Sequence, residues 1–396
     1  MWRATEGRRV FGYVGGMSHA HRARPAATMA VTAGLLGFVA LSGCARFDDS
    51  LASPFEPEPT AGGFAELVPP DPNQTPTTED EAPEEEGPCV DPDPAVVATC
   101  LEPTAGLTVL PGGGAALVSE RTTGRVLTVA PETEPDEFTQ IDVDGSGDGG
   151  LLDVALSPTF FEDRLLFAYI STPSDNRVVR VAPGDTPRPV LTGIPKGSTG
   201  NGGSISFDAA GGLVIRTGDA GDPAAAANPG SLAGKILRLA SPSPANPGDP
   251  QIVAIGLTGT GGACTDPVTG TLYATDRTPG GDRLVRVGDA GSLEPLWVWS
   301  DSPGTSQCAA LDNEIAVALV GGEAVSFVEI SDETGIVTGD PVFAVEGRYG
   351  QVYGAARGPE GEVWAGTVNK ASGDPVDSDD RVFIIPPDGG GGISPD

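Results

Sequence analysis

Residues 266–287 read Asp-Pro-Val-Thr-Gly-Thr-Leu-Tyr-Ala-Thr, then seven further residues, then Arg-Leu-Val-Arg-Val. This unit is an acidic turn with glycine, a short apolar run, a polar turn and a second apolar run. The same order recurs within residues 208–238 and 358–385. Short apolar runs between turn residues indicate strands, and their recurrence indicates repeated sheets. Six units over residues 104–396 would take about 49 residues each, the size of a four-stranded propeller blade.

The predicted fold is therefore all-β: a six-bladed β-propeller of four-stranded blades over residues 104–388. We expect the last strand, near residues 382–385, to close the ring by pairing within the first blade. The chain has 57 Gly and 38 Pro in 396 residues, which together is about twice the average share. That excess favours turns between short strands and argues against a helical bundle.

The charge and histidine content exclude several classes of function. The chain has 23 Lys and Arg against 55 Asp and Glu, a formal net charge of -32 at pH 7. A surface this acidic repels phosphate backbones, so nucleic acid is excluded as a partner. The two histidines, His19 and His21, lie near the amino terminus. If that terminus is removed, no imidazole remains for a Ser-His-Asp triad, a histidine base or a histidine-ligated metal.

The amino-terminal segment is typical of an export signal. Basic residues precede an uncharged apolar run at 26–41, which is shorter than the roughly 20 residues of a membrane-spanning helix. The run ends in Leu-Ser-Gly-Cys at 41–44, which resembles the bacterial lipobox, whose cysteine receives a diacylglyceryl group. We expect a lipoprotein signal peptide at 1–43, lipidation of Cys44, and export to the outer face of the cell membrane. An uncleaved anchor is the alternative.

The next segment is predicted to be a tether. Residues 45–103 are rich in proline and in acidic residues. Such a stretch cannot bury enough apolar surface to offset its ordering entropy. We therefore expect residues 44–103 to comprise the lipidated cysteine and a disordered acidic linker, and residues 389–396 to form a flexible tail.

Four further cysteines remain in a chain predicted to be exported, where disulfides are the default. Four cysteines allow three connectivities. We favour Cys89–Cys100, a local bridge at the edge of the domain, and Cys264–Cys308, which would join two neighbouring units. A cysteine-only metal site is the alternative, but no CxxC spacing supports it.

Several motifs carry a family resemblance. They are the segments GDGGLLDVALSP at 147–158, GNGGSISF at 200–207, TGDAGD at 217–222 and SLAGKILR at 231–238. Together they resemble the glucose/sorbosone dehydrogenase family, quinoproteins with a six-bladed propeller. The resemblance implies pyrroloquinoline quinone (PQQ) and calcium as cofactors and a sugar as substrate.

The departures from the family pattern fall on functional positions. The histidine base of the family's HNGG motif is replaced by Gly200, which has no proton acceptor. In the family's GLRNPQG motif the arginine contacts the cofactor, and here that position is Thr258, followed by Gly259. In the family's GGDEL motif, near the calcium region, the glutamate is replaced by Arg283. Asn201 and Asp219 remain at matching positions.

Loop carboxylates supply the candidate site residues, because functional groups gather in loops, although Asp is also a common turn residue. The candidate ligand-binding residues are Asn201, Asp219, Asp222, Asp276 and Arg277, and Asp219 is the catalytic base if the protein is active. A candidate calcium site is formed by Asp142, Asp144 and Asp148, whose alternation with glycines suits a hard cation; a solvated turn is the alternative.

Two main functions compete. The first is a catalytically degenerate propeller, anchored to the membrane, that binds a small molecule, a glycan or a protein partner through its acidic loops. The alternative is a PQQ-dependent aldose dehydrogenase with an altered base. A hydrolase acting through paired carboxylates is a third interpretation. Fold alone does not decide among them.

Overall fold

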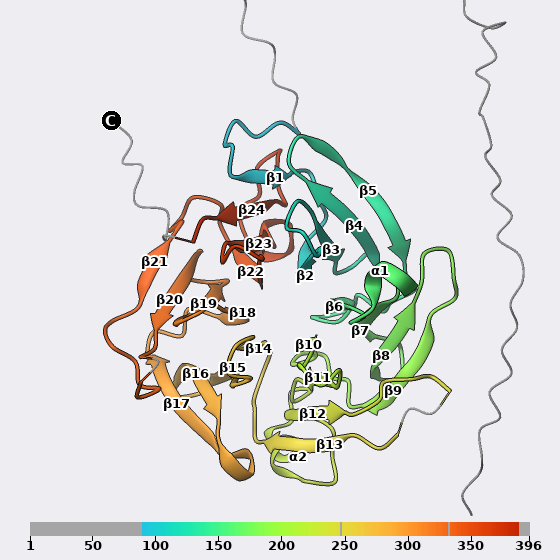
Figure 1. The fold of residues 1–396 in the computed structure, drawn as a ribbon, viewed down its shortest axis with the longest axis vertical. Coiled ribbons are helices and arrows are strands. Elements are labelled where there is room, and N and C mark those ends of the chain that lie inside the picture. The colour runs from blue at the N-terminus through green and yellow to red at the C-terminus, as the bar shows by residue number, and fades with distance from the viewer. Residues whose placement is uncertain (1–88, 246–247, 332, 388–396) are drawn as a thin grey trace, which may run out of the picture. The chain divides into compact units, whose positions relative to one another are not determined.

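The computed structural model describes residues 89–245, 248–331 and 333–387. These residues form six four-stranded antiparallel sheets arranged in a ring (Figure 1). The prediction of an all-β, six-bladed propeller with four-stranded blades is confirmed. The predicted signal peptide, Cys44, most of the tether and the tail at 389–396 lie outside the described residues.

In blades 1 to 5 the strands follow chain order from the axis outward. Blade 1 contains β2 (Thr104–Val109), β3 (Ala116–Glu120), β4 (Arg125–Ala130) and β5 (Thr133–Gln140). Blade 2 contains β6 (Leu151–Leu156), β7 (Leu166–Ser171), β8 (Asn176–Val181) and β9 (Arg188–Ile194). Blade 3 contains β10 (Ser204–Phe207), β11 (Leu213–Arg216), β12 (Lys235–Leu239) and β13 (Gln251–Ile255).

The second half of the ring repeats this order. Blade 4 contains β14 (Ala263–Thr265), β15 (Leu272–Thr278), β16 (Gly281–Val287) and β17 (Leu293–Trp299). Blade 5 contains β18 (Thr305–Ala310), β19 (Glu314–Leu319), β20 (Ala324–Glu329) and β21 (Val342–Ala344). Blade 6 contains β22 (Val352–Arg357), β23 (Val363–Thr367), β24 (Val382–Ile385) and β1 (Val96–Ala98). Short helices α1 (Phe160–Asp163), α2 (Pro223–Ala227) and α3 (Asn369–Ser372), with a 3-10 turn at Asp289–Gly291, lie in the connections.

The hydrophobic core lies between the blades. Each apolar cluster draws its buried side chains from two neighbouring sheets, as where Tyr169 of β7 and Leu237 of β12 share one cluster. Both faces of a strand are therefore covered. This explains why runs such as Leu-Phe-Ala-Tyr-Ile at 166–170 are apolar throughout instead of alternating.

The ring closes differently from the prediction. Val382–Ile385 is the third strand of blade 6, not a strand of blade 1, and β1 (Val96–Ala98) pairs beside it as the outermost strand. The segment assigned to the linker up to residue 103 thus contributes a strand to the propeller. The junction continues beyond β1, because Leu101 and Asp380 exchange two backbone hydrogen bonds and the Thr104 hydroxyl donates to the Thr367 carbonyl.

Both predicted disulfides are confirmed. Cys89–Cys100 encloses β1, and Cys264–Cys308 joins β14 of blade 4 to β18 of blade 5. The first therefore fastens the strand that closes the ring, and the second ties two innermost strands together near the axis.

We expect the two bridges to differ in their contribution to stability. Their cysteines are 11 and 44 residues apart, so loop-closure entropy predicts losses of about 3 kcal/mol for Cys89→Ser and about 4 kcal/mol for Cys308→Ser. Urea unfolding of the full-length variants measures both losses. A larger loss for Cys89→Ser than for Cys308→Ser would contradict the loop-size argument.

Among the described residues, no helix is long and apolar enough to cross a membrane.

Candidate functional site

The sequence-predicted residues gather at one end of the ring. Gly200 and Asn201 lie in the loop that enters β10, and Asp219 follows β11. Thr258 lies in the loop that enters β14, and Asp276 lies in β15. Because β10 and β11 are antiparallel, as are β14 and β15, the start of one strand and the end of the next share the same end of the ring.

Gly200 lies where the chain leaves no room for a side chain. Its φ is +73°, in the left-handed region. A Cβ placed there would lie 2.4 Å from Asp219 Oδ1 and 2.6 Å from the Gly221 nitrogen. The Gly200 nitrogen donates to Asp148 Oδ2 at 2.7 Å, and its carbonyl accepts from the Ala220 nitrogen at 2.9 Å. The backbone of two loops therefore closes around this position.

Asn201 is fully buried and its carboxamide is occupied by the loop around it. Its Oδ1 accepts from Asn176 Nδ2 at 3.0 Å and from the Gly197 nitrogen at 2.9 Å. Its Nδ2 donates to Asp148 Oδ1 at 2.6 Å and to the Gly197 carbonyl at 2.9 Å. Asn201 thus uses both donors and both acceptor positions to hold the loop.

The two carboxylates after β11 have different roles. Asp219 is 4% exposed and accepts from the Gly221 nitrogen at 2.9 Å, so it shapes the turn that covers Gly200. Asp222 caps α2, because its Oδ1 accepts from the Ala224 and Ala225 nitrogens at 3.0 and 3.2 Å. The structure therefore gives Asp222 a structural role in helix capping.

Asp276 is fully buried and paired with Arg283 of the neighbouring strand. Its Oδ2 accepts from Arg283 Nε at 2.8 Å and Nη2 at 2.5 Å, and its Oδ1 accepts from the Thr258 nitrogen at 2.6 Å. Next to it, Arg277 donates to the carbonyls of Thr305 and Gly304 at 2.6 and 2.9 Å. Both residues consequently tie blade 4 to its surroundings.

Arg216 is a buried cation that is not among the candidate residues predicted from the sequence. It is fully buried in β11 and donates to the carbonyls of Gly202, Gly259 and Thr258 at 3.1, 2.8 and 3.1 Å. Burial lowers the pKa of its guanidinium, and no carboxylate forms an ion pair with it among the described residues. An arginine inside the apolar run Leu-Val-Ile-Arg is the sequence signal that marks it.

The candidate calcium residues are held by separate partners. Lys196 pairs with Asp144, and this hydrogen bond is the main reason that the pKa of Asp144 falls to about 2. Asp148 is directed to the Gly200 and Asn201 loop instead. Asp142 is exposed. No cluster of three His, Cys, Asp or Glu side chains that could hold a metal is found within the described part of the chain.

Two comparisons with known proteins show which family this chain is similar to. The family model for glucose/sorbosone dehydrogenase matches residues 101–292. The PQQ-bound aldose sugar dehydrogenase of Streptomyces coelicolor is 31% identical, with a TM-score of 0.65 over 73% of this chain and 95% of that one. The chain belongs to the glucose/sorbosone dehydrogenase family.

Two further similar proteins have lower sequence identity to this chain. A putative glucose dehydrogenase of Thermus thermophilus is 27% identical, with a TM-score of 0.65 over 74% of this chain and 98% of that one. The aldose sugar dehydrogenase YliI of Escherichia coli K12 is 26% identical over 224 residues, which are 44% of this chain and 60% of that protein.

The site residues do not fit the PQQ and calcium of the glucose/sorbosone dehydrogenase family. The base position is Gly200, whose surroundings exclude a side chain. At the arginine position, the Thr258 hydroxyl is bonded to Asp276 Oδ1 at 3.1 Å and to the Arg277 carbonyl at 2.7 Å. Asp282 accepts from the Gly304 and Thr305 nitrogens at 2.6 and 2.8 Å. The groups that would meet the cofactor are thus replaced or already hydrogen-bonded within the protein.

Proposed function

We propose that this protein is a catalytically degenerate member of its family, exported and anchored to the cell membrane, that binds a ligand without oxidising it. The observation that carries this proposal is Gly200. Oxidation of an alcohol requires a group that takes the hydroxyl proton, and general-base catalysis supplies about 10²–10⁴-fold in rate. Gly200 supplies no such group, and the loop around it has closed onto the space that a side chain would need.

The cofactor contacts support the same proposal. Replacement of the family's arginine by Thr258 removes a charge-assisted contact, which typically contributes about 1.5–3 kcal/mol. The positive charge that Arg283 brings to this region neutralises Asp276. Weak PQQ affinity and slow chemistry should therefore occur together.

One observation favours the alternative, a PQQ-dependent aldose dehydrogenase. Asp219 Oδ1 lies against the Gly200 position, so a carboxylate is present beside the missing base. Its Oδ1 accepts from the Gly221 nitrogen, so as a base Asp219 would take the proton on Oδ2.

The test is reconstitution of the full-length protein with PQQ and Ca²⁺, followed by an aldose assay with an artificial electron acceptor. The aldose sugar dehydrogenase of Streptomyces coelicolor, assayed in parallel, controls for the cofactor. We expect turnover at least about 10²-fold below that control. Comparable turnover that is lost in Asp219→Asn would establish the dehydrogenase instead. Intact-mass analysis of membrane-extracted protein tests the anchor separately, since a Cys44 without a lipid adduct would refute it.

A further inference from the structure

A cavity of about 360 Å³ lies on the axis of the ring, away from the family's site. Its wall is formed by the later residues of all six innermost strands, including Asp153 of β6, Ser206 of β10 and Gln307 of β18. The loops with Gly200 and Thr258 precede β10 and β14, so they lie toward the opposite end of the channel. The volume is at the small end of the range for ligand pockets, about 300–1,000 Å³.

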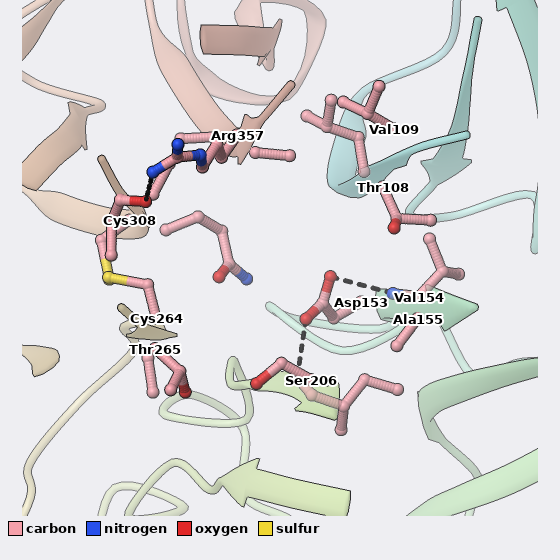
Figure 2. Close-up of a pocket in the computed structure, with 18 of the residues that line it drawn as sticks. Thr108, Val109, Asp153, Val154, Ala155, Ser206, Cys264, Thr265, Cys308 and Arg357 are labelled. Atoms are coloured by element: carbon pink, nitrogen blue, oxygen red, sulfur yellow. Dashed lines mark hydrogen bonds between the residues drawn. A yellow bond between two sulfur atoms is a disulfide. The ribbon is translucent and has the colours of Figure 1, made fainter. Parts of the chain in front are cut away.

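Asp153 is the buried charge of this cavity. Its carboxylate is 6% exposed and accepts from the Ile205 and Val154 nitrogens at 2.7 and 2.9 Å. Figure 2 shows it facing across the cavity from the Cys264–Cys308 disulfide. No cation pairs with Asp153 among the described residues. Burying a carboxylate without a cation costs free energy, because the charge loses its hydration. Each carboxylate oxygen of Asp153 can also accept a further hydrogen bond.

Other polar groups around Asp153 have unused hydrogen-bonding capacity. Gln307 donates through Nε2 to the Gly203 carbonyl at 3.0 Å, which leaves its oxygen to accept from elsewhere. The hydroxyls of Thr108 and Ser206 line the same cavity and have no hydrogen-bond partner within the described ranges. The cavity therefore presents several oxygen acceptors within an apolar wall that includes Leu107.

The charged side chains that line the cavity are one carboxylate, Asp153, and one guanidinium, Arg357. Arg357 lines it, but its guanidinium pairs with Asp312 at 2.8 Å. Asp153 has no such compensation, and the chain as a whole has a formal net charge of -32. A field of this sign concentrates small cations near the protein.

We propose that this cavity binds a small organic ammonium ion, whose cationic nitrogen donates to Asp153 and to neighbouring oxygen acceptors such as Gln307 Oε1. An ammonium group supplies three donors and the positive charge that Asp153 lacks. This proposal rests on the proposed ligand-binding function. It places the ligand in the axial cavity, at the end of the ring opposite the loops that contain Gly200 and Thr258.

Binding should strengthen as the pH rises. Burial raises the pKa of Asp153 to about 7, while the Ile205 and Val154 nitrogens act in the opposite direction. Arg357 is the other titratable side chain that lines the cavity. Tyr353 is not part of the lining but interacts electrostatically with Asp153, and burial raises the pKa of its phenol. Only the ionised form of Asp153 attracts an ammonium ion. Its affinity should therefore be at least about tenfold weaker at pH 5.5 than at pH 8.

The experiment is calorimetric titration of the full-length protein with 4-amino-1-butanol, with 1,4-butanediol as its neutral counterpart, in 150 mM salt at pH 8. We expect saturable one-to-one binding of the amine and none of the diol. Asp153→Asn should weaken amine binding at least about tenfold. Asp136→Asn, on the exposed strand β5, removes the same charge from a distant surface and should change nothing.

Ser206→Leu is a second variant that fills the cavity and retains both hydrogen bonds of Asp153 to the backbone, so it covers the case in which Asp153→Asn fails to fold. It should also abolish binding. Equal binding by wild type, Ser206→Leu and Asp136→Asn would place the amine on the outer surface and overturn the proposal, as would equal binding of the diol or no binding at all. PQQ-dependent turnover would refute the proposed function alone, because it leaves these titrations unchanged.

Discussion

Gly200→His, the substitution that would reinstate the family's base, is expected to destabilise the protein by about 2–5 kcal/mol and to restore no sugar oxidation. The positive φ costs a residue with a Cβ about 1–2 kcal/mol. The remainder comes from overpacking, typically about 1–3 kcal/mol. The Cβ would lie 2.4 Å from Asp219 Oδ1, 2.6 Å from the Gly221 nitrogen and 3.1 Å from the Ala220 nitrogen. Two of these atoms belong to the backbone and cannot rotate away.

Gly211→His is the matched control. Gly211 has a φ of +78°, close to that of Gly200, but nothing lies within 4 Å of the point where its Cβ would be. This variant should lose only the stability that a positive φ costs a residue with a Cβ, about 1–2 kcal/mol. Urea unfolding compares the two, and an aldose assay with PQQ and Ca²⁺ follows. Equal stability losses for both variants would show that the loop around Gly200 moves to accommodate a side chain. Recovered aldose turnover would show that the site still accepts a base.

Asp276→Ala is expected to cost about 3 kcal/mol of stability. The substitution leaves Arg283 Nε and Nη2 without Asp276 Oδ2, the oxygen that both contact, and the Thr258 nitrogen without its acceptor. Breaking a buried ion pair on one side typically costs about 3–5 kcal/mol. The lower end of that range applies because Arg283 retains 24% exposure, where water can solvate it.

Glu294→Ala supplies the comparison. Glu294 pairs at 2.8 Å with Arg286 on the same strand as Arg283, but the two side chains are 43% and 33% exposed. Exposed ion pairs contribute little to stability, because solvent screens them, so this loss should be small. Thermal and urea unfolding of both variants measures the difference. Similar small losses would mean that Asp276 is not a structural residue and would return it to the set of ligand-binding candidates.

Much of the fold could be predicted because the repeat places apolar runs at a fixed spacing. The unit at 208–238 is sufficient to predict β11 and β12, whose residues are buried on both faces. β1 could not be predicted in this way. It has three residues within an acidic, proline-rich segment, and its pairing partner β24 lies near the other end of the chain. A strand this short has no detectable period, so only its pairing defines it.

The candidate site was less predictable, because its residue types do not reveal their partners. Asp276 and Asp222 were expected to bind a ligand, but one is paired with Arg283 and the other caps α2. The sequence predicts that the position of the family's base, Gly200, has no basic side chain. The closed loop around Gly200 is known only from its φ and from the atoms near it in the structure. Asp153 interrupts the apolar run Leu-Leu-Asp-Val-Ala-Leu, and a lone carboxylate in a buried strand is the signal that would have identified it.

The pairing of β1 with β24 also determines the order in which this protein can fold. Residues near the beginning and the end of the described chain belong to one sheet, because β1 pairs with β24. The hydrogen bond between Thr104 of blade 1 and Thr367 of blade 6 likewise joins residues that are 263 positions apart. Contacts of this separation raise the contact order and slow folding, because a long loop must close before they form. Blade 6 cannot be completed until β24 has been synthesised. Until then, the partly formed ring presents open blade faces and an unpaired sheet edge, both of which favour aggregation.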